Sequence, residues 1–324
     1  MPRFHASDRF LFRHGGHIHA ARVGIGIFAS LGIAWWLHLP NGVWVAVSFL
    51  IVMASLQHHG NIQRRAVERA VGTLVGAVAG VGILGLQSAV GSTALTFAVM
   101  ALLCGVCAYH AVGRGGYMAQ LVAITLVIVA GFGTDPISVG LWRAVDVLVG
   151  IAVALVLTRA FPLYARAFWR LAMADALMRA AGLLENWPTA PEEATVGFIA
   201  LSPILQKLRG LMPPVSRESG LGMGRIETIQ RHLRHALSLM ELATSRAKAT
   251  EQAEDPAGNT LTRGEASVIA LWLRALGEGL ESGNWAAPWE TPPATETSIA
   301  AQLIGRELAA LHAELIAAPE LWRR

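Results

Sequence analysis

Residues 69–76 read RAVGTLVG, and residues 143–150, which begin 74 positions later, read RAVDVLVG, so six of the eight positions are identical. Each copy opens the third apolar segment in a set of three. Because three is odd, the second set enters a bilayer from the side opposite to the first. The pattern predicts an inverted repeat, a common plan among transporters, with the substrate site where the repeats meet. It also predicts one arginine, Arg69 or Arg143, near each face of the membrane.

The composition is that of a membrane protein in the first half and of a soluble domain in the second. The 324 residues are 54% hydrophobic, with a mean hydropathy of +0.48. Residues 1–160 hold ten arginines and four acids, a net charge of +6, whereas residues 161–324 hold 16 basic and 18 acidic residues, a net charge of −2. The sequence pI near 9.6 therefore belongs to the membrane half. No basic patch on a soluble face supports nucleic-acid binding.

Six segments are apolar and nearly as long as a transmembrane helix, which takes about 20 residues. They are residues 20–39, 42–57, 67–86, 93–112, 117–133 and 139–161. We therefore predict an all-α fold with a six-helix transmembrane bundle in residues 20–161. Two inverted three-helix repeats, at about 20–86 and 93–161, build this bundle. A cytoplasmic segment, 1–19, precedes it, and a cytoplasmic helical domain, 162–324, follows.

The arginines outside the apolar segments predict the orientation. The connections at 39–41, 87–92 and 134–138 contain no lysine or arginine, whereas the connections on the other side contain Arg64, Arg65 and Arg114. Positive residues favour the cytoplasmic side of a membrane. Both termini are therefore predicted to lie in the cytoplasm, and the protein in the bacterial inner membrane.

Two arginines are candidate anion ligands. Arg143 lies at the non-cytoplasmic start of the sixth segment, where a charge is costly unless it pairs or faces a cavity. Asp146 follows one turn later, so the two side chains could partly neutralise each other, whereas Arg69 has Gly72 in that place. Snorkelling of Arg143 to the membrane interface is the alternative. Asp146 and Glu68, the acids within the membrane segments, are candidates for coupling to an ion.

Two turns break the apolar pattern at places 74 positions apart. Residues 40–42 (PNG) and 113–116 (GRGG) begin the two short segments, 42–57 and 117–133. Short segments with Gly or Pro breaks at matching positions point to a transporter's binding site, because helix N-termini there present N–H groups to an anion. The simpler interpretation is a tight turn at the membrane surface.

Other patterns predict packing. Gly72, Gly76 and Gly80 have the spacing of close helix contacts. Cys104 and Cys107 form a C-x-x-C inside an apolar segment, which favours helix packing over redox or metal chemistry.

No enzyme activity, metal site or cofactor is predicted. The sequence has no Walker, G-x-S-x-G or H-E-x-x-H motif and no paired catalytic carboxylates. His58 and His59 fit no zinc spacing. They are candidates for a pH-sensitive or proton-relay position.

In residues 162–324, apolar residues recur at helical spacing among charged ones. Five amphipathic helices are predicted, at residues 163–187, 192–212, 226–249, 261–280 and 297–317. Three proline-containing dipeptides separate them: Pro213-Pro214, Asp255-Pro256 and Pro292-Pro293. One helix carries an apolar stripe, which predicts a bundle core or, alternatively, a subunit interface: Ile226, Ile229, Leu233, Leu237 and Met240.

Several stretches together resemble the fusaric acid resistance and aromatic acid exporter family. They are the opening of the first segment from Arg22 to Gly26, then 42–46 (GVWVA), 68–76 (ERAVGTLVG), 143–150 and Phe161-Pro162. The spacing Arg-x-x-Gly-Thr-x-x-Gly, at 69–76, is the most specific. The plan of six spans followed by a helical domain is also distantly similar to the plant aluminium-activated malate transporter family.

The resemblance implies export of small organic anions, often aromatic carboxylates. The candidate substrate-binding residues are Arg69, Arg143, Trp44, Tyr117, Thr73 and Asp146. Guanidinium groups bind carboxylates through two parallel hydrogen bonds. Trp44 and Tyr117 could stack on the ring of an aromatic substrate. Many bacterial exporters of this kind carry two membrane halves, whereas this chain has one, so a homodimer is implied. Some exporters also use a periplasmic adaptor and an outer-membrane channel.

Two other functions stay open on the sequence alone. One is a gated organic-anion channel with the helical domain as its gate. The other is a membrane scaffold or envelope-assembly protein without transport activity, in which both arginines are structural.

Overall fold

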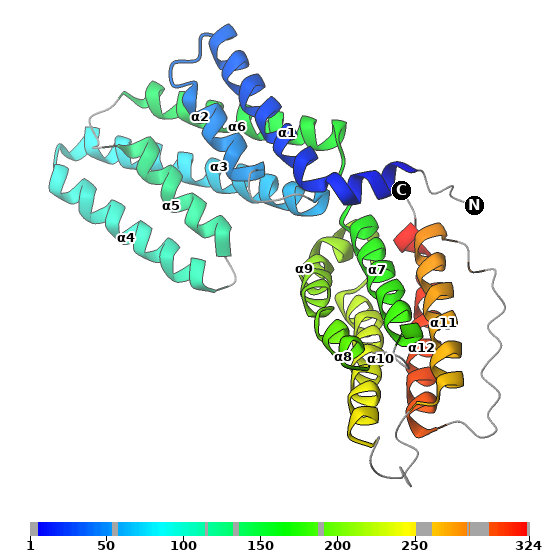
Figure 1. Cartoon of the computed structure of the whole chain (residues 1–324). Helices are drawn as coiled ribbons and strands as arrows, with labels where there is room; N and C mark the ends of the chain where they lie inside the picture. Colours follow the sequence, from blue (N-terminus) through cyan, green and yellow to red (C-terminus); the bar gives the residue numbers. More distant parts are fainter. Residues whose placement is uncertain are drawn as a thin grey trace. The chain divides into compact units, whose positions relative to one another are not determined.

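The structure, a computed structural model, describes residues 6–53, 58–113, 116–131, 136–186, 191–250, 261–283, 285 and 298–322. All regular structure in these ranges is helical, as predicted, with twelve α-helices and a final 3-10 helix (Figure 1). The chain divides into two compact units. Residues 14–163 form the membrane domain, and residues 1–13 with 164–324 form the bundle domain.

The membrane domain contains six helices in the order of the six predicted segments. They are α1 (Ala6–Trp36), α2 (Val43–Met53), α3 (His59–Val90), α4 (Thr93–Val112), α5 (Gly116–Ala130) and α6 (Ile137–Ala160). Helices α1, α3, α4 and α6 are long and apolar enough to cross a membrane. Helices α2 and α5 have 11 and 15 residues, about 16 and 22 Å at 1.5 Å per residue. Both are shorter than the ~30 Å hydrocarbon core.

Helix α1 begins earlier than the sequence pattern indicated. The segment 1–19, predicted to be separate from the first span, is helical from Ala6 and continuous with it. The part of α1 up to Arg13 belongs to the bundle domain. No proline interrupts residues 6–36, so nothing in the sequence forces the helix to end at the membrane boundary.

Helix α3 approaches α5 so closely that only glycine fits between them. Gly72, Gly76 and Gly80 all face α5. A β-carbon at Gly76 would lie 2.6 Å from the carbonyl oxygen of Val122 and 2.7 Å from Cβ of Thr125. The glycine spacing therefore marks a helix crossing, as predicted.

The crossing of α6 with α2 repeats this contact. A β-carbon at Gly150, the repeat partner of Gly76, would collide with the carbonyl oxygen of Val45 and lie 2.9 Å from Cβ of Ser48. The valine and threonine of α5 that meet Gly76 stand 77 positions after Val45 and Ser48. Each short helix thus meets the long helix of the other half in the same way.

These contacts give α2 and α5 a register of their own. Residues 45–52 read VAVSFLIV and residues 122–129 read VAITLVIV, with four of eight positions identical. The offset between α2 and α5 is 77, whereas the offset between α3 and α6 is 74. The stretch from α2 to α3 is therefore three residues longer than the stretch from α5 to α6. The turn at 40–42 directly precedes α2 and Gly113 lies just before α5, so the equivalence of the two turns at an offset of 74 stays a prediction.

We expect Gly76→Ala to destabilise the membrane domain by about 1–3 kcal/mol, because the added carbon forces two packed backbones apart. Gly82→Ala on the same helix is the matched control, since no atom lies within 4 Å of the carbon that it adds. It should gain up to about 1 kcal/mol through helix propensity. Thermal unfolding in detergent measures both changes. Equal melting temperatures for the two variants would contradict the tight crossing.

Apolar cores fill both crossings. One consists of α2, α3 and α6 side chains: Phe49, Val52, Met53, Ile62, Ala66, Val147, Ile151, Val153 and Ala154. The other contains Ile83, Leu126 and Ala130, and Cys104 of α4 packs against it as a free thiol. The C-x-x-C segment thus contributes packing, as its apolar surroundings favoured.

The bundle domain comprises α7 (Ala165–Asn186), α8 (Pro191–Ile199), α9 (Ser202–Ser219), α10 (Met223–Thr250), α11 (Arg263–Ser282), α12 (Ile299–Ile316) and the 3-10 helix Pro319–Trp322. The apolar stripe of α10 is buried, with each of its five residues at most 4% exposed. The stripe is therefore bundle core, and the subunit-interface alternative is not needed to explain it.

Two helix boundaries in the bundle domain differ from the prediction. Residues 192–212 form parts of two helices, because the chain turns at Ala200-Leu201. Pro213-Pro214, predicted to end a helix, lie inside α9. Two prolines remove two helical N–H donors, but Pro214 and its neighbours Leu211 and Val215 are buried. Packing of this face offsets the loss. The pairs at 255–256 and 292–293 lie outside the described residues.

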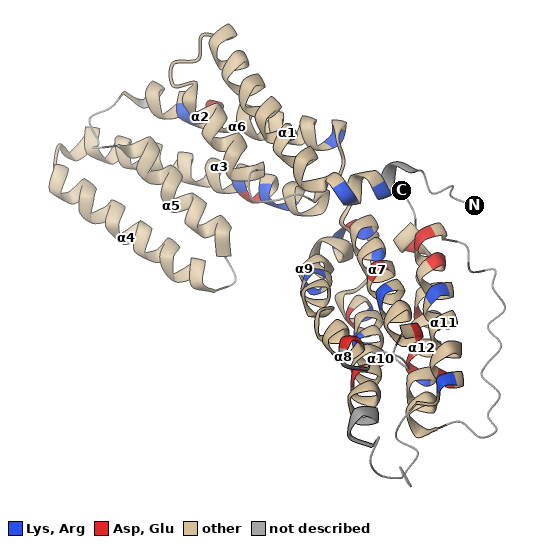
Figure 2. Ribbon diagram, viewed as in Figure 1, with Lys and Arg blue, Asp and Glu red and all other residues tan. Residues whose placement is uncertain are grey.

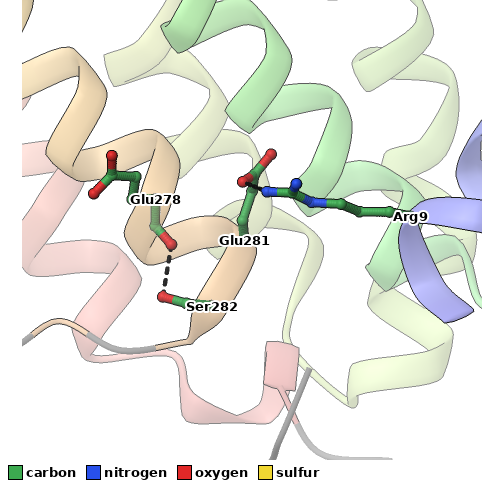
Figure 3. A network of polar contacts seen from close by, with 4 residues as sticks. All are labelled: Arg9, Glu278, Glu281 and Ser282. Carbon is green, nitrogen blue, oxygen red and sulfur yellow. Dashed lines mark hydrogen bonds and ion pairs between the residues drawn. The ribbon is translucent and has the colours of Figure 1, made fainter. Parts of the chain in front are cut away.

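The first turns of α1 pack on the bundle through one charged and one aromatic contact. Arg9 forms an ion pair with Glu281 near the end of α11 (Figure 3). Phe12 meets the ring of Phe168 edge-to-face at 5.6 Å, and Lys207 lies over the Phe12 ring at 4.7 Å. The Arg9 side chain is 65% exposed, so its ion pair adds little and the aromatic contact holds this segment in place.

Candidate functional site

Charged side chains are sparse in the membrane domain. Figure 2 shows no charged residue on α4 or on α5. Among the charged residues of this domain that the structure describes, three are almost completely buried: Arg22 at 1%, Arg69 at 2% and Asp146 at 0% exposure. A buried charge in a membrane protein is costly unless it is compensated, and it marks a candidate functional position.

Arg69 points from α3 toward the crossing of α2 with α6. Its Nη2 donates a long hydrogen bond of 3.4 Å to Oγ of Ser48. Its Nε has no hydrogen-bond partner among the described residues. Its polar neighbours among the described residues are the hydroxyl groups of Ser48 and Tyr117, and no described carboxylate is among them. Arg69 is thus a buried cation that this part of the chain leaves uncompensated.

Tyr117, at the start of α5, brings a second arginine to the same place. The guanidinium of Arg65 stacks over the Tyr117 ring at 3.7 Å from its centre. The Tyr117 hydroxyl also interacts with Arg69, although the geometry falls short of a hydrogen bond and the oxygen is buried without a partner. The Tyr117 side chain is therefore close to two cations from adjacent turns of α3, with Arg65 over its ring and Arg69 near its hydroxyl.

Thr73 follows Arg69 by one helical turn and lies on the same face of α3. It is fully buried, and its hydroxyl has no hydrogen-bond partner in the described part of the chain. We call Ser48, Arg65, Arg69, Thr73 and Tyr117 the Arg69 cluster. The cluster carries two positive charges and no negative one, and it offers hydroxyl and N–H donors.

Glu68 does not neutralise the Arg69 cluster. Its carboxylate accepts a hydrogen bond from Nε of Arg64 at 2.6 Å, an i,i+4 pair on the outer face of α3. Adjacent residues of a helix do not share a face, so Glu68 points away from Arg69.

Arg143 is bound to α5 and not to Asp146. Its Nη1 donates to the carbonyl oxygen of Ile128. Both carboxylate oxygens of Asp146 are buried and accept no hydrogen bond from the described residues. The mutual neutralisation expected from their spacing is therefore wrong, because the Arg143 side chain reaches across to the neighbouring helix.

The two arginines contact opposite ends of α5. Arg69 interacts with Tyr117 and Arg143 with Ile128, and eleven residues of helix span about 16 Å. In this conformation one carboxylate cannot touch both guanidinium groups.

The remaining predicted site residues are Trp44, His58 and His59, which lie on or just before the helices that carry the Arg69 cluster. Trp44 is half-buried in the first turn of α2, four residues before Ser48 and on the same helix face. His58 is buried just before α3, and the backbone N–H of His59 donates to the carbonyl oxygen of Leu163 at 2.9 Å. Among the described residues no three His, Cys, Asp or Glu side chains gather as metal ligands.

Sequence reasoning missed three of these residues. Ser48 would have stood out through the match of 45–52 with 122–129, which pairs it with Thr125, also buried. Arg65 was used only as evidence for orientation. Arg22 entered only through the family resemblance, and no pattern in its segment signals that it is buried.

Comparison with known proteins gives two findings. Residues 28–157 match the family model described as fusaric acid resistance protein-like. The inner membrane protein YeeA of Escherichia coli (strain K12) is 29% identical to the chain over 247 residues, which cover 74% of this chain and 69% of that protein. The family match contains α2 to α5 entirely and, with them, the whole Arg69 cluster.

Proposed function

Residues 28–157 belong to the fusaric acid resistance protein-like family, and from this premise we propose that the chain exports small organic anions, chiefly aromatic carboxylates. The chain is a multi-pass inner-membrane protein with an inner-membrane relative. Transport, and not enzymatic catalysis, is the activity that this membership favours.

The uncompensated charge of Arg69 carries the proposal. Burying a guanidinium without a counter-ion is expensive, and at 2% exposure water offers Arg69 little relief. An anion that enters the membrane domain would supply the missing charge. The partnerless Nε would complete the bidentate hydrogen bonds that a guanidinium makes with a carboxylate.

The surroundings of Arg69 favour an aromatic acid. The Tyr117 ring and the Arg65 guanidinium already lie face to face at 3.7 Å, and either surface can stack a substrate ring. Trp44, on the Ser48 face of α2, is a further aromatic surface. Aliphatic acids would gain the carboxylate contact without the stacking.

The helix crossings favour an inverted repeat that alternates. The α3–α5 and α2–α6 crossings use the same contact at Gly76 and Gly150, so the two halves are related in packing as well as in sequence. Rocking one repeat against the other would loosen one crossing while the other stays closed. An anion held first by Arg69 would pass to Arg143 near the other end of α5.

The direction of transport follows from charge. With both termini in the cytoplasm, the start of α3 and the Arg69 cluster lie toward the cytoplasmic side. An anion leaving a cell that is negative inside gains about 2.3 kcal/mol per 100 mV. Export is therefore electrically downhill, and the membrane potential can drive it without ATP.

The test uses proteoliposomes with the purified full-length chain, loaded with labelled 4-hydroxybenzoate or with the neutral, similarly shaped 4-hydroxybenzamide. We expect saturable efflux of the acid above protein-free liposomes and none of the amide. Discrete currents in planar bilayers would identify a channel instead of a carrier. If folded protein moves no organic anion in either assay, the proposal is refuted. The hypothesis of a membrane scaffold without transport activity then remains.

A further inference from the structure

We propose that Asp146 is a proton-binding site, which holds a proton while the α2–α6 crossing is closed and releases it when that crossing opens to water. The inference deepens the proposed function, because it adds a second ligand to the same membrane domain. It rests on the burial of Asp146, on the absence of partners for its oxygens and on its place in the repeat.

Among the described residues, the side chain has no hydrogen-bond donor of the kind that an ionised carboxylate needs. Asp146 is 0% exposed, and neither oxygen accepts a hydrogen bond from the described residues. An ionised carboxylate without water or donors is far costlier to bury than a neutral carboxyl group. The group avoids this cost by keeping its proton.

The repeat shows that this carboxyl group is an addition to the crossing. Gly72, the partner of Asp146, lies where a β-carbon would come within 2.7 Å of Leu121 Cβ. In the register of 77, Leu121 corresponds to Trp44 at the start of α2. By this correspondence we expect the Asp146 side chain to face the first turn of α2.

The elements around Asp146 offer few charges that could ionise it. Of the helices packed against α6, α2 carries no titratable or charged residue and α5 carries Tyr117. Helix α3 carries His59, Arg64, Arg65, Glu68 and Arg69. On α6 itself they are Arg143 and Arg159, and Arg22 is buried on α1. Of these, Arg143 is nearest along the helix, and its Nη1 donates to the carbonyl of Ile128.

Protonation of Asp146 would favour occupancy by the anion. An ionised carboxylate one turn from Arg143 would repel a substrate carboxylate and compete for that guanidinium. When the carboxyl group is neutral, Asp146 no longer competes with the substrate for the Arg143 guanidinium. Proton binding and anion binding are then linked, each strengthening the other.

The first experiment measures the proton directly and needs no transport. Infrared spectra of the purified protein at neutral pH should contain a protonated-carboxyl band that Asp146→Asn removes. Asp146→Gly, which restores the glycine of the other repeat, guards against a folding defect of the first variant. Glu227→Gln on the exposed surface of α10 is the matched control and should leave the band unchanged. A band that survives both Asp146 variants would overturn the proposal.

The second experiment follows labelled 4-hydroxybenzoate efflux at equal pH on both sides, between about pH 6 and pH 9, where this carboxylate stays ionised. Wild-type efflux should fall as pH rises, with a limit of about tenfold per pH unit for one group. Asp146→Asn should be flat. A pH profile that is unchanged in Asp146→Asn would refute the coupling while leaving anion export standing. Loss of efflux at every pH in the wild type would refute anion export while the infrared result still decides the proton site.

Discussion

Replacing Arg69 with methionine is expected to reduce anion export strongly while leaving the protein at least as stable as the wild type. Truncating one partner of a buried, charged hydrogen-bonded pair costs about 2–5 kcal/mol. Efflux at low substrate concentration should therefore fall by about thirtyfold to several-thousandfold. Arg69→Lys keeps the charge but loses the bidentate geometry, so its efflux should lie between those of methionine and arginine.

The stability half of this prediction follows from the missing counter-ion. Arg69 gives up only a 3.4 Å hydrogen bond to Ser48, whereas the apolar side chain removes an uncompensated buried charge. Replacements of buried charges by apolar residues of similar volume are often neutral or stabilising by about 1–4 kcal/mol. Thermal unfolding in detergent, together with initial efflux rates, measures both effects.

Arg64→Met is the control, because Arg64 lies on the same helix, is 63% exposed and is bound to Glu68. It should keep efflux within about threefold and change stability by less than about 1 kcal/mol. If Arg69→Met exports normally, Arg69 is not the anion ligand. If it instead melts much earlier than the wild type, Arg69 is a structural residue.

Replacing Arg143 with methionine should have the opposite effect on stability. The carbonyl of Ile128 lies in the last turn of α5, which ends at Ala130, so it has no partner within the helix. Arg143 donates to it. Removing the only described donor should cost about 1–3 kcal/mol, and a cation at this end of a helix is also favourable to the helix dipole.

Arg159→Met is the matched control, since Arg159 is exposed in the last turn of α6. Its loss should cost at most about 1 kcal/mol. Melting curves of the two variants, recorded side by side, provide the measurement. If Arg143→Met is as stable as the wild type, the Arg143–Ile128 contact does not hold α5. Opposite signs for Arg69 and Arg143 would show that two residues alike in sequence have different roles.

Features that depend on local pattern could be predicted from the amino-acid sequence alone. Apolar length and helical spacing predicted the all-helical fold, the order of the six membrane helices and the two short ones among them. The glycine spacing at 72, 76 and 80 predicted a close crossing, because only glycine lets two backbones approach so near. The copy of 69–76 at 143–150 named both arginines, although not their different surroundings.

The tertiary structure decided what depends on helix rotation and on side-chain reach. Ser48, Arg69 and Tyr117 come from three helices, so no spacing along the chain places them together. Arg143 donates a hydrogen bond to the Ile128 carbonyl of α5 and not to Asp146 one turn away, because a long flexible side chain can reach a neighbouring helix. Packing of Pro214 likewise kept α9 helical through two prolines. Local helix propensities amount to about 1–3 kcal/mol per residue. Burial against a neighbouring helix overrides them where it contributes more.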